Sequence, residues 1–239
     1  MRLLLRFHKL GALSWISHLD TLRTMEKALR RAKLPLALTQ GFNPHPKMSF
    51  AIPLAVGVAS QGDYLELELQ QDLPLQQVVD SLNTTLPGEL QMRSANLIPP
   101  KAPALMALAA FSQYRLKLPQ DDATNWQTVC QDLMAEKQIM VQRQGKGGVV
   151  NQLEIRPGLL HLAVVNLGEE LYLEATWETS SRLFIRLGEV IEILARSGGV
   201  APWSLAISMP LRLDIGVKEG KRFLSLEEYF PLVWQRYAI

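Results

Sequence analysis

The sequence predicts an α+β protein with two successive domains, each with the element order β-α-β-β-α-β. Several short segments alternate between apolar and polar residues at period two, which is typical of strands that bury one face. Between them lie amphipathic segments with apolar residues at helical spacing. Three prolines within residues 99–103 stop regular structure and divide the 239 residues into two halves.

The first half begins with a strand-like run over residues 2–8. Ser17, followed three residues later by Asp20, has the form of a capping box and starts a helix near residue 18. The apolar residues of this helix fall on one face: Leu22, Met25, Leu29 and Ala32. The other elements expected in this half are strands at 34–38, 63–70 and 90–98, a Pro/Gly/Asn loop at 41–47 and a helix at 75–86.

The second half is expected to repeat this order. Its strands are predicted at 112–118, 170–178 and 205–215, its helices at 124–137 and 182–196, and a hairpin at 149–155 and 159–166 around the turn Arg156-Pro-Gly158. We therefore expect two tandem ferredoxin-like domains with antiparallel sheets and helices on one face. Their bounds are 1–98 and 111–239, the second with a C-terminal tail, and a Pro/Ala-rich linker spans 99–110.

Composition excludes several classes of protein. The single cysteine, Cys130, rules out an intramolecular disulfide and any Cys-x-x-Cys metal site. The chain has no 18-residue apolar stretch, and its N-terminal apolar run is too short for a signal peptide, which predicts a soluble cytoplasmic protein without membrane partners. Nucleotide-binding, hydrolase and metalloprotease motifs are absent, so no cofactor or metal is predicted.

The net charge of +2 is unevenly distributed. Residues 1–50 contain nine lysines and arginines against two acids (+7), and residues 51–99 contain one against six (−5). The remaining residues balance at fifteen against fifteen. Positive charge is therefore concentrated in the first fifty residues, around the first helix and the loop that follows it.

Four cations of the first helix lie within about a quarter-turn of each other, opposite its apolar face. With a lysine in the following loop, they form a candidate phosphate-binding surface. These residues are Arg23, Lys27, Arg30, Arg31 and Lys47. The alternative is an ordinary solvated helix face.

Two histidines occupy polar settings near this helix. His18 is two residues from Asp20, which is a candidate to orient its imidazole. The alternative is that Asp20 serves the first turn of the helix instead. His45 lies between two prolines, so the backbone is held extended at both Asn43 and His45. We predict Asn43 and His45 as recognition residues, and His18, Asp20 and His45 as catalytic residues only if the protein is an enzyme. A histidine bonded to a loop carbonyl and a His/His/Asp metal site are the alternatives.

The first half contains the segments Ser17-His-Leu-Asp20, Gln40-Gly-Phe-Asn-Pro-His-Pro-Lys47, Pro53-Leu-Ala-Val-Gly57 and Gly62-Asp-Tyr-Leu-Glu66. Here the chain resembles the radical SAM-linked protein family, a domain of unknown function found beside or fused to radical SAM proteins with a cobalamin-binding domain. The resemblance implies such a partner and weakly an RNA-related setting. The segment Glu154-Ile-Arg156-Pro157 is similar to a further family motif, which makes Arg156 a candidate recognition residue. A charge pair between Glu154 and Arg156 on one strand face is the alternative.

Three functions remain open. The first is a non-catalytic accessory protein that binds RNA or presents substrate to a partner radical SAM enzyme, in RNA modification or processing. The second is a metal-independent endoribonuclease with His18 or His45 as general acid or base. The third is a protein-interaction module whose basic helix docks on an acidic surface.

Overall fold

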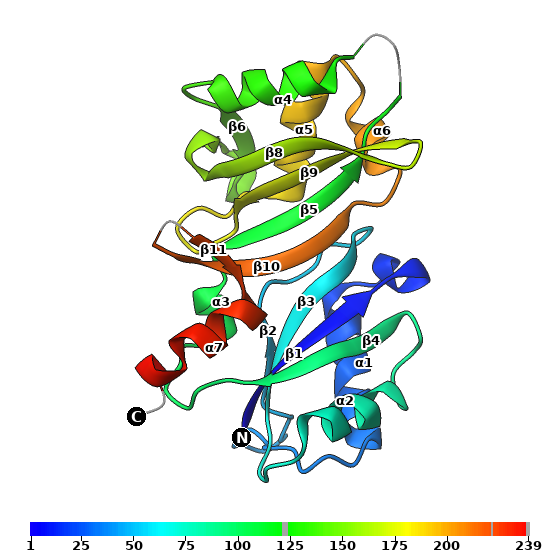
Figure 1. Ribbon diagram of the computed structural model, residues 1–239, viewed down its shortest axis with the longest axis vertical. Helices are drawn as coiled ribbons and strands as arrows, with labels where there is room; N and C mark the ends of the chain where they lie inside the picture. Colours follow the sequence, from blue (N-terminus) through cyan, green and yellow to red (C-terminus); the bar gives the residue numbers. More distant parts are fainter. Residues whose placement is uncertain (121–123, 221, 238–239) are drawn as a thin grey trace. The chain divides into compact units, whose positions relative to one another are not determined.

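The computed structural model describes residues 1–120, 124–220 and 222–237 of a mixed α+β chain with mainly antiparallel strands (Figure 1). The chain divides into two compact units. Unit 1 comprises Met1–Ala110 and Arg212–Ile239, and unit 2 comprises Phe111–Leu211. Within the described ranges, no helix is long and apolar enough to cross a membrane.

Unit 1 is built on an antiparallel sheet whose central strand is β1 (Arg2–Lys9). It pairs on one edge with β4 (Leu90–Leu97) and on the other with β3 (Ala59–Glu68). The far edge of β3 carries β2 (Met48–Phe50) and β10 (Leu211–Glu219), and β11 (Arg222–Ser225) pairs with β10.

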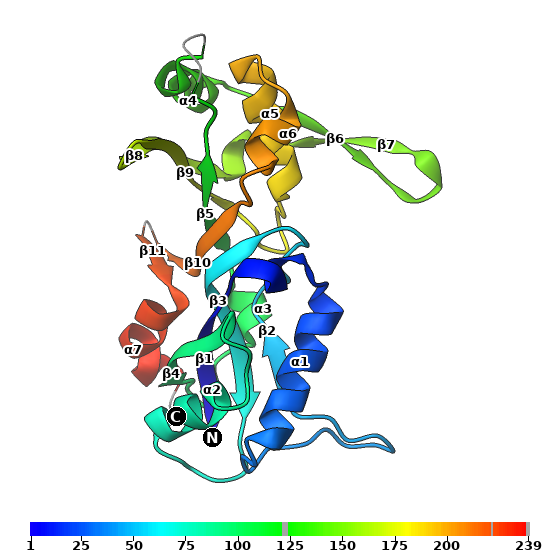
Figure 2. The same cartoon turned by 90° about the vertical axis from the view of Figure 1, so that its right-hand side faces the viewer.

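Both faces of this sheet are covered by helices, whereas the sequence predicted helices on one face only. Figure 2 shows α1 (His18–Arg31) and α7 (Leu226–Tyr237) on opposite sides of the strands. The reason lies in β1, where the consecutive Leu3, Leu4 and Leu5 are all fully buried. Because successive side chains point to opposite faces of a strand, such a run requires a core on each side.

The first core lies beneath α1 and α2 (Leu75–Asn83), where Leu3, Leu5 and Phe7 meet Met25 and Val78. The second core lies on the other face, where Leu4 and Tyr64 meet α3 (Leu105–Leu108), β10, β11 and α7. The segment predicted as a linker, 99–110, therefore packs into unit 1. The C-terminal residues from 212, predicted in the second domain, also belong to unit 1, because Ile215, Tyr229 and Phe230 fill this second core.

One predicted strand of unit 1 is missing. Residues 34–38 form only isolated bridges, Leu36 with Leu69 and Leu38 with Pro46. Pro35 has no backbone N–H to donate, and the adjacent segment already occupies the edge of β3 as β2. The predicted helix starting near residue 18 is confirmed, and a 3-10 turn (η1, Gly11–Trp15) precedes it.

Unit 2 contains the antiparallel strands β5 (Phe111–Lys117), β9 (Glu170–Glu178) and β8 (Leu159–Leu167), paired in the order β5-β9-β8. Its helices are α4 (Trp126–Ala135), α5 (Leu187–Gly198) and α6 (Pro202–Ala206). A separate hairpin pairs β6 (Met140–Gln144) with β7 (Val150–Glu154). Short 3-10 turns follow each of these hairpin strands: η2 (Lys146–Gly148) and η3 (Arg156–Gly158).

Two predictions for unit 2 are wrong. Residues 149–155 pair with β6 rather than with residues 159–166, because Gly147 and Gly148 adopt positive φ and close a turn before β7. Residues 205–215 are not one strand. Pro202 starts α6, and Pro210 separates that helix from β10.

Candidate functional site

The N-terminus of α1 is capped as the sequence predicts. The Ser17 hydroxyl accepts a hydrogen bond from the Asp20 backbone N–H (3.1 Å) and donates one to the Asp20 carboxylate (2.7 Å). The bond from Ser17, together with the Arg23 guanidinium 3.2 Å away, lowers the pKa of the Asp20 carboxyl. Asp20 is therefore engaged by its own helix turn and does not orient His18.

The His18 ring is half-buried and packs edge-on against Phe50, with ring centroids 5.1 Å apart. Burial lowers the pKa of His18, and the nearby positive charges of Lys9 and Arg212 lower it further, against the opposing effect of Asp63. The lowered pKa favours the neutral form of this imidazole, which packs against an apolar neighbour.

His45 is attached to the outer face of α1 instead. Its Nδ1 lies 3.1 Å from Oε1 of Glu26, and its backbone is bonded twice to Thr39 across the base of the loop. The carbonyl of Pro44 accepts a hydrogen bond from Arg30 (3.3 Å). The 39–47 loop is therefore fastened to α1 at two points.

The two histidines do not form one site. His18 is the first residue of α1, and Glu26, which holds His45, follows eight residues later, about 12 Å along the helix axis. The sequence left open whether His18 and His45 share a cleft, and the structure places them at separate positions along α1. The described part of the chain also contains no cluster of three or more histidine, cysteine, aspartate or glutamate side chains suited to a metal ion.

The five predicted phosphate-binding cations fall into two groups. Arg23 is paired with Asp20, and Lys47 is paired with Glu68 at 3.2 Å. The other three are exposed on α1 and have no carboxylate partner among the residues that the structure describes: Lys27, Arg30 and Arg31. Arg30 and Arg31 each donate to a backbone carbonyl, which orients the guanidinium without neutralising its charge.

The tip of the 39–47 loop exposes the predicted recognition residue Asn43 and, beside it, Phe42, whose side chain is fully exposed. Neither Phe42 nor Glu26 was predicted from the sequence as a candidate residue of this surface. The sequence signal that could have indicated Phe42 is a large aromatic side chain within a Gly/Asn/Pro loop, where few neighbours are expected to bury it. No local pattern predicts the pairing of Glu26 with His45, because it depends on how the loop folds back.

The Arg156 side chain is held by hydrogen bonds within the protein. Its guanidinium donates to the backbone carbonyls of Met134 and Glu136 at the C-terminal end of α4, and to that of Leu159. Glu154 accepts from the backbone N–H groups of Ile139 and Arg156, so the two side chains do not form the alternative charge pair. Arg156 thus caps a helix end, and its donors are directed into the protein rather than outward.

A buried charge cluster lies beneath His18 in unit 1. Asp63 and Arg212 form an ion pair at 2.9 Å, and both side chains are almost completely buried. Lys9 is 1 % exposed, and its ammonium donates to the carbonyl of Ile16 and the hydroxyl of Thr21. Burial raises the pKa of Asp63 and lowers that of Lys9. The sequence offered no pattern for this cluster, since its members are far apart in the chain.

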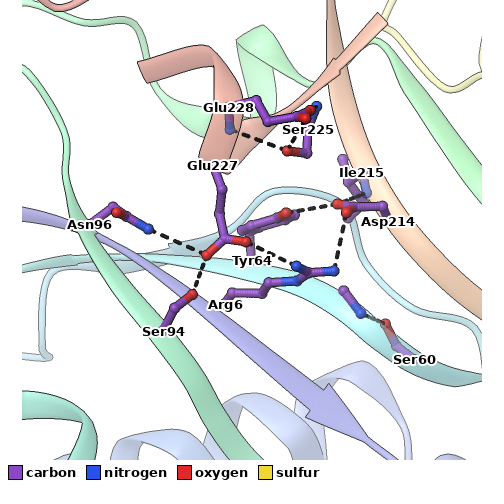
Figure 3. A network of polar contacts seen from close by, with 11 residues as sticks. Arg6, Ser60, Tyr64, Ser94, Asn96, Asp214, Ile215, Ser225, Glu227 and Glu228 are labelled. Atoms are coloured by element: carbon purple, nitrogen blue, oxygen red, sulfur yellow. Dashed lines mark hydrogen bonds and ion pairs between the residues drawn. The ribbon is translucent and has the colours of Figure 1, made fainter. Parts of the chain in front are cut away.

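A second polar network joins α7 to the sheet of unit 1 (Figure 3). The Arg6 guanidinium donates to Glu227 (2.9 Å) and to Asp214 (3.1 Å), and Tyr64 donates to Asp214 (2.7 Å). Burial raises the pKa of Asp214. Glu227 also accepts hydrogen bonds from two side chains of β4, Ser94 and Asn96. Almost every hydrogen-bond donor of this network is paired with Asp214 or Glu227. We therefore assign the network a structural role, which is to hold α7 against the sheet.

Comparison with known proteins gives one family. The model of an uncharacterized protein conserved in bacteria (DUF2344) matches residues 2–186. The chain belongs to the DUF2344 family. No curated protein matches it. Among solved structures, this DUF2344 chain is similar to a chain of "Crystal Structure of a Cbf5-Nop10-Gar1 Complex", at 13 % identity and a TM-score of 0.46. That match covers 99 % of this chain and 56 % of the other, so this chain spans a little over half the length of that relative.

Proposed function

We propose that the chain is a non-catalytic accessory protein that binds single-stranded RNA through the outer face of α1 and the 39–47 loop. The observation that carries this proposal is the fully exposed Phe42, in a loop fastened to the same helix face as the cations Lys27 and Arg30. Exposed aromatic side chains beside positive charge form the usual surface for single-stranded nucleic acid.

Each part of this surface has a separate task. Lys27, Arg30 and Arg31 contact phosphates, and their contribution falls as salt concentration rises. Phe42 stacks on a base, and the amide of Asn43 is the neighbouring group that can form hydrogen bonds with a base edge. Arg23 and Lys47 contribute less, because each already has a carboxylate partner. His45 acts by positioning the loop.

The fold supports a two-unit scaffold for this role. In unit 1, β2 pairs with β3, β3 with β1 and β1 with β4, all antiparallel, which is the order of a ferredoxin-like sheet. In unit 2, α4 lies between β5 and β8 in sequence and α5 follows β9, with the β6–β7 hairpin inserted. We infer that both units are variants of the ferredoxin-like fold.

The proposal includes a partner enzyme of the radical SAM class with a cobalamin-binding domain, on the strength of the sequence resemblance. Copurification from cells expressing both proteins tests this part. We expect the enzyme to be retained after nuclease treatment. Loss of the enzyme on nuclease treatment would mean that RNA alone bridges the two, and no copurification at all would contradict the partnership.

RNA binding is tested by fluorescence anisotropy with a labelled single-stranded RNA and the full chain. Since stacking of one base on an aromatic side chain is worth about 1–3 kcal/mol, Phe42→Ala should weaken binding about tenfold and Phe42→Trp should preserve it. Exposed Leu232 on α7 provides the control, Leu232→Ala, which should bind like the wild type. Equal affinity of wild type and Phe42→Ala would contradict the proposal.

A second candidate function is favoured by the pair of His45 and Glu26. A carboxylate bonded to Nδ1 of an imidazole that is 59 % exposed leaves Nε2 as the nitrogen that could serve as a general base. In an endoribonuclease, Nε2 would take the proton of a ribose 2′-hydroxyl while the 2′-oxygen bonds to phosphorus. The bond to the 5′-oxygen then breaks, that oxygen takes a proton from water, and the hydroxide left behind takes the proton from Nε2. RNA cleavage that is lost in both His45→Ala and Glu26→Ala would establish this activity, and an intact RNA would exclude it.

A further inference from the structure

Unit 2 contains a pocket of about 380 Å³ beside α6 that none of the predicted site residues lines. This volume lies in the range of sites for small organic ligands. The pocket is formed where the segment after β5 meets α6 and the residues that follow it. All of its lining residues belong to unit 2.

The walls of the pocket are apolar and one of them is aromatic. Trp203 and Ile207, four residues apart along α6 and its C-cap, are 67 % and 75 % exposed. Leu118 also lines the pocket and is only 1 % exposed, so it belongs to the core of unit 2. An exposed tryptophan that lines a pocket is available to a ligand, whereas Trp126 and Trp177 of the same unit are buried in the core.

The rim of the pocket is polar but carries no net charge. Lys117 and Glu170 both line it and neutralise each other in an ion pair of 2.6 Å. The remaining polar groups are the amide of Gln120 and the hydroxyls of Ser204 and Ser208. The Gln120 amide already donates to the carbonyl of Glu169, and the Ser204 hydroxyl donates to that of Ala201. Gln120 therefore keeps its oxygen and a second N–H, Ser204 keeps its oxygen as an acceptor, and the Ser208 hydroxyl can donate or accept. These lining residues include no unpaired cation, so the pocket is not suited to a phosphate or a carboxylate.

We propose that this pocket binds the base of a ribonucleotide, stacked on Trp203 and hydrogen-bonded at its edge to the Gln120 amide and the serine hydroxyls. An uncharged planar heterocycle fits the combination of an aromatic wall, neutral rim and mixed donors and acceptors. The inference deepens the proposed function and rests on it, since it adds a base-reading subsite in unit 2 to the phosphate-binding face of unit 1.

Equilibrium dialysis of the full chain with labelled adenosine tests the pocket. Adenosine has no phosphate, so its binding is independent of the cations on α1. We expect Trp203→Ala to weaken binding about tenfold and Trp203→Phe, which keeps a stacking surface, to stay within about threefold of the wild type. Trp15→Ala is the matched control, because Trp15 in unit 1 is similarly exposed (62 %), and it should have no effect.

Two results would overturn this inference: no adenosine binding by the wild type, or equal binding by wild type and Trp203→Ala. The first result would indicate that the pocket receives an apolar side chain of a protein partner rather than a base. The test also separates the two proposals. Adenosine binding that depends on Trp203, in a chain without affinity for RNA, would retain the pocket and contradict the RNA-binding face of unit 1.

Discussion

The imidazole of His45 lies 3.1 Å from the carboxylate of Glu26, nineteen residues earlier in the chain. This contact, with the bond from Arg30 to the carbonyl of Pro44, holds the 39–47 loop against the basic face of α1. The exposed Phe42 and the cations of the helix therefore belong to one surface. Glu26 also places a negative charge among those cations, which sets a limit on how strongly the face attracts phosphate.

The first prediction concerns that negative charge. Glu26→Gln keeps an oxygen that can accept a hydrogen bond from His45, so the loop should stay in place. Removal of the charge should then raise RNA affinity about two- to threefold at low salt, an effect that fades as salt rises. Anisotropy titrations at two salt concentrations measure it. Weaker binding by Glu26→Gln would show that the contact of Glu26 with His45 matters more to the position of the loop than the charge of Glu26 does to RNA binding.

The second prediction concerns pH. The pKa of His18 is lowered in the folded chain, so the unfolded chain binds a proton more readily at this residue. The contribution of His18 to stability is therefore fully present above about pH 6.5 and is lost as pH falls through the folded pKa. Denaturant unfolding between about pH 7.5 and 5.5 should show a smaller loss of stability in His18→Gln than in the wild type. The exposed His161 supplies the control, and His161→Gln should follow the wild type.

The third prediction concerns the network that holds α7. Glu227→Ala removes an acceptor shared by Arg6, Ser94 and Asn96. Leaving these partly buried donors unsatisfied should lower the free energy of unfolding by about 2 kcal/mol. Denaturant unfolding checks this value, with Asp72→Asn as the control because Asp72 is almost fully exposed. If Glu227→Ala changed the free energy of unfolding as little as Asp72→Asn does, water would be replacing the Glu227 carboxylate as acceptor without a loss of stability.

The fourth prediction assigns Arg156 to stability. Because its guanidinium binds three backbone carbonyls, Arg156→Ala should lower the free energy of unfolding by about 1–3 kcal/mol, and Arg156→Lys should restore only part of it. RNA affinity should not change. Arg182, whose side chain is 80 % exposed, gives the control Arg182→Ala. Loss of RNA affinity without loss of stability would return Arg156 to the recognition residues.

The parts of the fold that local patterns determine were predictable. The capping box at Ser17 and the apolar spacing along the following helix place α1 correctly, and alternation places β9 at Glu170–Glu178. Strand pairing was not predictable in this way, since the partner of β7 depends on the glycine turn at Gly147 rather than on the more obvious Arg156-Pro-Gly158. The membership of β10 and α7 in unit 1 depends on packing between residues some two hundred positions apart.

The candidate site also has parts that local sequence patterns predict and parts that they do not. Sequence reasoning found the cations of α1 and the loop with Asn43 and His45, because charge and proline spacing are local properties. It placed Asp20 beside His18 by proximity in sequence. In the structure the Asp20 carboxylate instead accepts hydrogen bonds from Ser17 and Arg23, and the His45 imidazole contacts Glu26. Side-chain partners across a loop are set by tertiary structure, and no spacing rule predicts them.

The salt dependence of RNA binding tests the central claim most directly. Three unneutralised cations on α1 should give a slope of log K against log salt of about −2, at about −0.7 per phosphate contact for single strands. The triple variant Lys27→Gln/Arg30→Gln/Arg31→Gln should bring the slope close to zero, whereas Lys137→Gln in unit 2 should leave it unchanged. A wild-type affinity that does not depend on salt, or a triple variant with the wild-type slope, would contradict the account.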